Sequence, residues 1–158
     1  MKKKYNWKVF LFSALIVFVL VGGIGSLFTS SRTDTVWYYS IKPDITPPNW
    51  VFPIVWNFLF ILITFSLYFA WTNSRNKKQK KKVALLFGIN FLLNILWSVL
   101  FFGLKQTQLA FFEIILLWFS ILMVILGVNK ISKKSSWLLL PYLIWVAFAS
   151  ILNYIVAF

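Results

Sequence analysis

The stretch that decides the fold is WYYSIKPDITPPNWVFPIVWNFLF, residues 37–60. It holds four of the chain's five prolines, three of its nine tryptophans and two of its six tyrosines. Its first half is rich in turn-forming residues, and its second half is an apolar run typical of a helix. A polar, aromatic loop that leads directly into an apolar helix predicts one wall of a binding site together with its cover.

The composition indicates a membrane protein. Of the 158 residues, 61% are hydrophobic and 12% are charged, against roughly 45–50% and about 25% in soluble domains. The net charge of +13 does not indicate nucleic-acid binding, because the Lys and Arg residues cluster between apolar runs. The chain has no His and no Cys. That absence excludes disulfides, metal sites built on these ligands, and Ser–His or Cys–His catalysis.

Five apolar runs are each long enough to cross a bilayer, which takes about 20 helical residues. We therefore predict an all-α membrane protein, a five-transmembrane-helix bundle that forms one domain over residues 1–158. Thr46-Pro47-Pro48 is typical of a helix start, since Thr can cap a helix and Pro is tolerated in its first turn. The predicted spans are about 9–28, 48–71, 83–102, 109–128 and 137–157, with a lid loop at 29–49.

The distribution of positive charge predicts the orientation. Thirteen of the sixteen Lys and Arg residues fall in the N-terminus and in connectors 73–82 and 130–136. The lid loop, the 103–108 turn and the C-terminus share the other three. The positive-inside rule therefore places the N-terminus in the cytoplasm and the lid loop outside the cell membrane. We expect loop 29–49 to be mobile, because its charged residues keep it solvated.

Three spans carry aromatic residues at helical spacing, and two of these stripes also contain asparagine. One interpretation is structural: the amides join helices and the rings fill the core. The other is a pocket for a flat, aromatic, largely apolar ligand. The stripes are Phe52, Trp56 and Phe60 in the second span, Asn90, Asn94, Trp97 and Phe101 in the third, and Tyr142, Trp145, Ala149 and Asn153 in the fifth.

Two further features of the spans leave alternatives open. Glu113 is the only acidic residue inside a span; it either reaches the membrane interface, pairs with Lys105 or Arg32, or holds a proton for transport. Gly22 and Ser26 form a small-xxx-small pair, which serves either internal packing or close approach of a second copy.

Four ordered motifs resemble the TspO/MBR family, the tryptophan-rich sensory proteins and translocator proteins also called peripheral-type benzodiazepine receptors. The resemblance covers essentially the whole chain. One departure is Ile45, two residues after the Lys-Pro pair, where the family usually carries an aromatic residue. The motifs are WYxxxKPxxTPPxWVFxxVW at 37–56, NxxxNxxWSxxFF at 90–102, AxxExxLLW at 110–118 and WxLxPYxxWxxFAxxLN at 137–153.

The resemblance implies a five-helix bundle, commonly a homodimer, with a pocket at its outer end under the first loop. It implies that the ligand is a porphyrin, a haem-related tetrapyrrole or another flat apolar small molecule, with no required cofactor and no metal site. The animal sterol pattern needs a basic residue after a C-terminal Tyr, and NYIVAF has none. The implied ligand-binding residues are Tyr38, Pro47, Pro48, Trp50, Phe52, Trp56, Phe60, Asn90, Asn94, Trp97, Phe101, Trp145 and Ala149.

Three functional hypotheses follow from this reading. The first is a tetrapyrrole-binding sensor or carrier. The second is an enzyme that degrades porphyrin in light, with Trp56 and Trp145 as the catalytic residues that the resemblance implies. The third is a proton-coupled transporter of small molecules that uses Glu113. The residues alone do not decide whether the protein is an enzyme.

Overall fold

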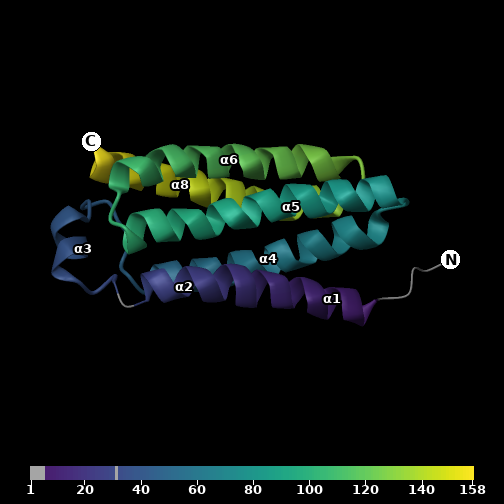
Figure 1. The fold of residues 1–158 in the computed structure, drawn as a ribbon, viewed down its shortest axis with the longest axis horizontal. Helices are drawn as coiled ribbons and strands as arrows, with labels where there is room; N and C mark the ends of the chain where they lie inside the picture. The colour runs from purple at the N-terminus through teal and green to yellow at the C-terminus, as the bar shows by residue number, and fades with distance from the viewer. Residues whose placement is uncertain (1–5, 31) are drawn as a thin grey trace.

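The computed structural model describes residues 6–30 and 32–158, and in these ranges the chain forms five long antiparallel helices (Figure 1). All five are long and apolar enough to cross a membrane. The predicted bundle is confirmed, and the protein is a multi-pass integral membrane protein. Lys2, Lys3 and Lys4, which the orientation prediction also uses, lie outside the described residues. The spans are Trp7–Thr29, Val51–Asn73, Lys77–Gly103, Thr107–Asn129 and Lys133–Ala157.

Two of the spans are single α-helices, α4 (Val51–Asn73) and α6 (Thr107–Asn129). The other three are composite. The first joins α1 (Trp7–Ala14), the π-helical segment η1 (Leu15–Gly23) and α2 (Ile24–Thr29). The third joins α5 (Lys77–Ser98) and the π-helical segment η2 (Val99–Gly103), and the fifth joins α7 (Lys133–Leu138) and α8 (Leu140–Ala157).

Two basic connectors are shorter than predicted, because much of each is helical. Helix α5 begins at Lys77, where the Asn76 side chain accepts a hydrogen bond from the backbone N–H of Gln79 (2.9 Å). Helix α7 begins at Lys133, capped in the same way by Ser132. Lysine is a good helix former and its long side chain reaches water from a helix end. Hydropathy therefore places these helix starts several residues too late.

The last span is broken where the sequence predicts continuous helix. Helix α7 ends at Leu138, and α8 begins at Leu140 with Pro141 in its first turn. Proline lacks the N–H that would continue the helical ladder, so it stands at the start of a new helix. The break lets α7 pack against α4 while α8 follows α6.

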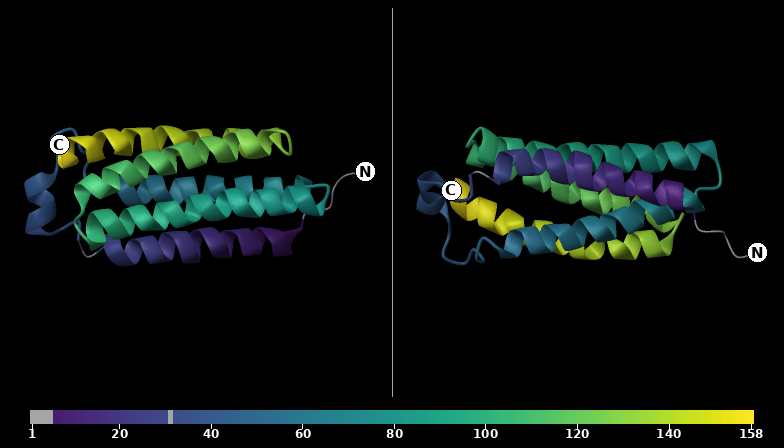
Figure 2. Two further views of the ribbon diagram at one scale, coloured as in Figure 1. Left: turned by 45° about the horizontal axis from the view of Figure 1, so that its top comes forward. Right: turned by 90° about the horizontal axis from the view of Figure 1, so that it is seen from below.

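The lid loop also differs from the prediction. Helix α4 begins at Val51 and not at Pro48, because residues 46–50 form turns in which Thr46 N donates to the Pro43 carbonyl and Val51 N donates to that of Pro48. The loop contains a helix of its own, α3 (Val36–Ile41), capped by Thr35. It closes the end of the bundle near the C-terminus, opposite the N-terminal end (Figure 2).

The two halves of the bundle are packed differently. Toward the N-terminal end the helices meet closely, and Ser66 of α4 and Ser135 of α7 exchange hydrogen bonds between each hydroxyl and the other residue's carbonyl (2.9 and 2.8 Å). Both serines are fully buried. Toward the lid end the helices enclose a cavity.

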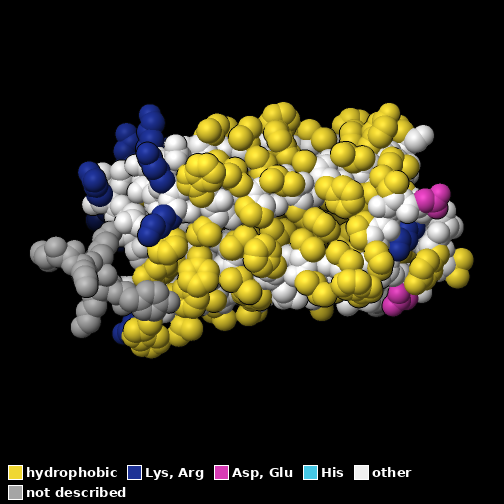
Figure 3. Space-filling view, turned by 180° about the vertical axis from the view of Figure 1, so that it is seen from behind, with side chains coloured by type: hydrophobic (Ala, Val, Ile, Leu, Met, Phe, Trp, Pro, Cys, Tyr) yellow, Lys and Arg dark blue, Asp and Glu magenta, His cyan; other side chains and the backbone are white. Residues whose placement is uncertain are grey.

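The surface matches a membrane setting. Hydrophobic side chains cover the flank between the two ends, and Lys and Arg side chains gather at the N-terminal end (Figure 3). We call the latter the basic end. Its described cations lie on α1, α5, α7 and the connectors, with no described Asp or Glu among them; they are Lys8, Arg75, Lys77, Lys78, Lys80, Lys81, Lys82, Lys130, Lys133 and Lys134. Which end faces the cytoplasm stays a prediction.

Candidate functional site

A cavity of about 670 Å³ lies at the lid end, between the helices and under the lid loop. This volume falls in the range of roughly 300–1,000 Å³ that is typical of small-molecule sites. Its walls come from η1, α2, α4, α5, η2, α6 and α8, and residues 38–49 of the lid loop close it. Every span therefore contributes to one chamber.

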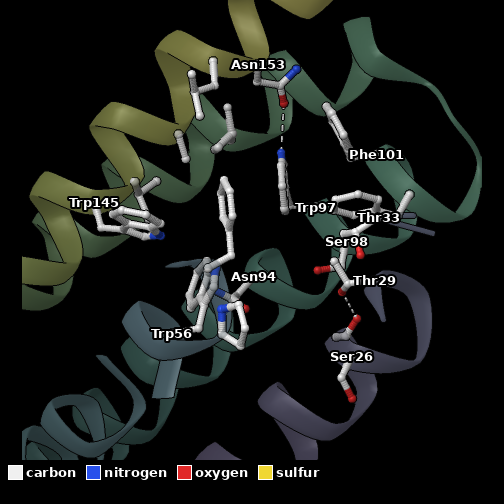
Figure 4. Close-up of a pocket in the computed structure, with 18 of the residues that line it drawn as sticks. Ser26, Thr29, Thr33, Trp56, Asn94, Trp97, Ser98, Phe101, Trp145 and Asn153 are labelled. Carbon is white, nitrogen blue, oxygen red and sulfur yellow. Dashed lines mark hydrogen bonds between the residues drawn. The ribbon is translucent and has the colours of Figure 1, made fainter. Parts of the chain in front are cut away.

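Of the three tryptophans that line the cavity, one lies on α4 and one on α8 (Figure 4). Trp56 packs against Phe60 and against the edge of Tyr142, with ring centres 5.6 and 6.1 Å apart. Trp145 packs edge-on to Phe52 at 5.8 Å. In the described part of the chain neither indole Nε1–H donates a hydrogen bond. Both rings thus line the cavity, and each has an Nε1–H donor that no described residue takes up.

Trp97 is held differently from these two. Its Nε1 donates to Asn153 Oδ1 of α8 (2.9 Å), and its ring stacks on Phe101 at 5.2 Å. Asn153 Nδ2 in turn donates to the Thr107 carbonyl at the start of α6 (3.0 Å). One amide therefore joins the third, fourth and fifth spans and fixes the orientation of a cavity wall.

The other intramembrane asparagines also join helices. Asn94 Nδ2 donates to the Tyr142 hydroxyl (2.9 Å) and Asn90 Nδ2 donates to Ser120 Oγ (2.8 Å). Asn94 lines the cavity as well, whereas Asn90 does not. Asn90 therefore only joins helices. Asn94 and Asn153 both join helices and line the cavity.

The structure brings together nine of the thirteen predicted ligand-binding residues around this cavity. As ligand contacts they remain predictions. Pro47, Pro48, Trp50 and Asn90 do not line it. Trp50 is 66% exposed, because it precedes the first residue of α4 and turns away from the bundle. The nine lining residues are Tyr38, Phe52, Trp56, Phe60, Asn94, Trp97, Phe101, Trp145 and Ala149.

The first span supplies cavity residues that sequence reasoning missed. Gly22, Gly25, Ser26 and Thr29 line the cavity, and a Cβ added at Gly22 would lie 2.9 Å from the ring of Phe60. Gly22 is thus used for contact within the chain, whereas Ser26 is exposed. The four-residue spacing of Gly22 and Ser26 was the available signal. Such spacing indicates that a helix face can be approached closely, but it does not say which helix approaches.

The lid loop adds polar residues to the cavity that were also missed. Lys42, Thr46 and Asn49 line its outer end. Tyr38 lies beside them, and burial together with the neighbouring Tyr39 raises the pKa of its hydroxyl above the ordinary value. The phenol therefore stays neutral and keeps its proton as a donor at neutral pH.

The lid is docked onto the end of the third span. Arg32 Nη1 donates to the Phe102 carbonyl (2.8 Å), and Lys105 Nζ lies 5.3 Å from the Trp37 ring centre. Tyr38 packs on Phe102 with ring centres 5.8 Å apart. These contacts anchor the lid at specific points, and its mobility stays a prediction.

Glu113 lies outside the cavity and away from both predicted partners. It is 5% exposed, so it does not reach the interface, and neither carboxyl oxygen has a hydrogen-bond partner among the described residues. Arg32 and Lys105 are engaged elsewhere, as described above. Ser120, seven residues on, shares its helix face and bonds to Asn90 of α5, so Glu113 lies on a face of α6 that is turned to the interior of the bundle.

Comparison with known proteins gives consistent matches. A family model described as the TspO/MBR family matches residues 13–158. A tryptophan-rich protein TspO of Chlorobaculum tepidum is 40% identical over 85% of each chain, and one of Archaeoglobus fulgidus is 39% identical over 91% of this chain and 92% of its own. A translocator protein of Ovis aries is 32% identical over 75% of this chain and 71% of its own.

Proposed function

This chain belongs to the TspO/MBR family, and from that premise we propose that it binds a tetrapyrrole in the cavity under the lid, as a membrane sensor or carrier. The observation that carries the proposal is the cavity of about 670 Å³ with Trp56 and Trp145 on its walls. A planar macrocycle presents two apolar faces, which indole rings contact well. The name translocator protein, borne by relatives such as that of Ovis aries, is in keeping with a carrier.

The residue types also bear on which tetrapyrrole binds. Axial ligands of haem iron are usually His, Cys, Met or Tyr. The chain has no His or Cys, and Met123 is 58% exposed on the outer face of α6. Tyr38 lines the cavity, but its neutral phenol is a poor ligand. Contact with the macrocycle, and not coordination of iron, therefore supplies the affinity in this proposal.

We expect metal-free protoporphyrin IX and haem to bind with similar dissociation constants. Titration of the purified protein in bilayer nanodiscs, followed by porphyrin absorbance and tryptophan quenching, measures both; empty nanodiscs correct for partition into lipid. Haem binding more than about tenfold tighter than the free porphyrin would show an iron ligand that this proposal does not contain. Absence of saturable binding of either compound would overturn the proposal itself.

A second candidate function rests on the two open indoles beside the cavity. If the protein degrades porphyrin in light with dioxygen as the oxidant, bound protoporphyrin should bleach faster in the wild type than in Trp56→Phe and Trp145→Phe at equal occupancy. Equal bleaching rates in all three would remove the catalytic role. Proton-coupled transport gains no support from the site, because Glu113 does not line the cavity.

The homodimer that the family resemblance implies stays part of the proposal. Gly22 faces Phe60 of the same chain whereas Ser26 is exposed, so the small pair of the first span leaves both of its predicted uses open.

A further inference from the structure

The cavity has two chemically different ends. Trp56 and Trp145 lie on one side, and the hydroxyls of Ser26, Thr29 and Ser98 gather on the other (Figure 4). The lid loop adds Lys42, Thr46 and Asn49. Of the described residues that line the cavity, Lys42 alone carries a formal charge. A ligand in this chamber therefore meets indole rings from the helices and a cation from the lid loop.

The backbone holds Lys42 in place. It follows the last residue of α3 and precedes Pro43, with φ −67° and ψ 119°. Proline disfavours the helical conformation for the residue before it, so Pro43 ends α3 at this point. The lysine thus leaves the helix in an extended conformation at the rim of the cavity.

Within the described ranges, no ion pair neutralises the Lys42 ammonium group. Its Nζ donates to Asn49 Oδ1 (2.9 Å) and lies 6.0 Å from the Tyr38 ring centre. The Asn49 amide also donates to the Thr33 carbonyl and to Asp34 Oδ1 (3.2 and 3.4 Å). Asp34 is exposed and lies outside the cavity lining; it orients the amide that in turn orients Lys42. An ammonium group has three donors, and one of them is used here.

A second donor in the same turn has no partner. Thr46 Oγ1 is buried, and no described residue hydrogen-bonds to it. Thr46 also lines the cavity, and its backbone N–H donates to the Pro43 carbonyl (2.9 Å), one residue beyond Lys42. Leaving a buried hydroxyl without a partner is costly, and a small shift of the lid that brings an acceptor oxygen of a ligand against Thr46 Oγ1 would relieve that cost.

We propose that Lys42 and Thr46 form an anion subsite that selects ligands with a carboxylate at the edge of a flat apolar ring. This rests on the proposed tetrapyrrole binding and narrows it to acidic tetrapyrroles, those with free propionate groups, over their neutral esters. The same subsite fixes the ligand's direction: the carboxylate lies under the lid, where water is near, and the ring lies between the indoles.

The test compares two ligands that share one ring. Protoporphyrin IX carries two carboxylates, and its dimethyl ester carries none. In nanodiscs of neutral lipid, with empty nanodiscs subtracted, the wild type should bind the acid roughly tenfold more tightly than the ester, since a charge-assisted hydrogen bond is about twice as strong as a neutral one and favours the ion. Raising the salt concentration should bring this ratio closer to one, because salt screens the attraction between the carboxylate and Lys42.

Lys42→Gln should lower affinity for the acid by roughly tenfold and leave that for the ester unchanged, which also shows that the variant is folded. Thr46→Val should also lower the ratio of acid affinity to ester affinity, but by a smaller factor than Lys42→Gln does. The matched control is Lys130→Gln, which removes a cation from the basic end without touching the cavity or the lid; its acid-to-ester ratio should equal that of the wild type.

Three results would overturn the subsite: equal binding of acid and ester by the wild type, equal loss of both ligands in Lys42→Gln, or the same change of the acid-to-ester ratio in Lys130→Gln. Each of these leaves tetrapyrrole binding itself standing. If neither ligand binds the wild type, the proposed function fails and the subsite fails with it.

Discussion

Replacing Trp145 with alanine is expected to weaken binding of protoporphyrin IX by roughly 10- to 100-fold, as truncation of a central tryptophan in a binding site commonly does. The substitution removes an indole face from the cavity wall and also removes one of the two open Nε1–H donors. Phe52, which packs edge-on to Trp145, loses its support at the same time. Equilibrium titration in nanodiscs measures the change.

Trp137→Ala is the matched control for this prediction. Trp137 lies in the same span, but it is 69% exposed and does not line the cavity. The control should retain wild-type affinity, whereas Trp145→Phe should lie between the wild type and Trp145→Ala because it keeps a ring and loses the donor. Equal affinities in Trp145→Ala and Trp137→Ala would place the porphyrin elsewhere on the protein.

Asn153→Leu should be the most destabilising of the changes considered for the polar network, lowering the free energy of unfolding by roughly 1–3 kcal/mol. This follows from the Trp97 Nε1–H, which loses its partner, whereas the Thr107 carbonyl keeps its backbone bond within α6. Asn153 is 2% exposed, so water does not replace the amide. Thermal unfolding in a mild detergent, followed by near-ultraviolet circular dichroism, provides the comparison.

Asn57→Leu is the control, since the Asn57 amide bonds only to the Pro53 carbonyl of its own helix (2.8 Å) and the side chain is exposed. It should change stability little. Trp97→Phe combined with Asn153→Leu should recover part of the loss, because the double variant has no indole donor left to satisfy. A double variant as unstable as the sum of the two single variants would mean that the hydrogen bond contributes nothing.

The number and order of the spans were predictable because each one repeats the same simple pattern, a charge-free run between basic or polar connectors. Their ends were less so. Lys77–Lys82 is both strongly polar and helical, and hydropathy measures only the first property. The break at Leu139 depends on Pro141, which the sequence shows but which is also compatible with a kinked continuous helix.

The aromatic stripes predicted much of the cavity for a physical reason: spacing of three and four residues fixes which side chains share a helix face. What spacing does not fix is how each helix is rotated against its neighbours. Asn90 shares a face with Asn94, yet the fourth span takes it as a hydrogen-bond partner. The lid residues Lys42 and Thr46 belong to no periodic pattern, so only their three-dimensional placement under α3 brings them to the cavity.

The uneven charge of the two ends bears on how the chain is made. The described connectors at the lid end carry Arg32, Lys42 and Lys105, whereas the basic end carries the ten cations named above. During biosynthesis the helices can enter the bilayer as hairpins, each of which carries only a lightly charged turn across. Reversing the finished molecule would instead move the ten cations through the membrane, at about 2.3 kcal/mol per charge for every 100 mV of opposing potential in addition to desolvation. Once inserted, the protein has no route to the opposite orientation.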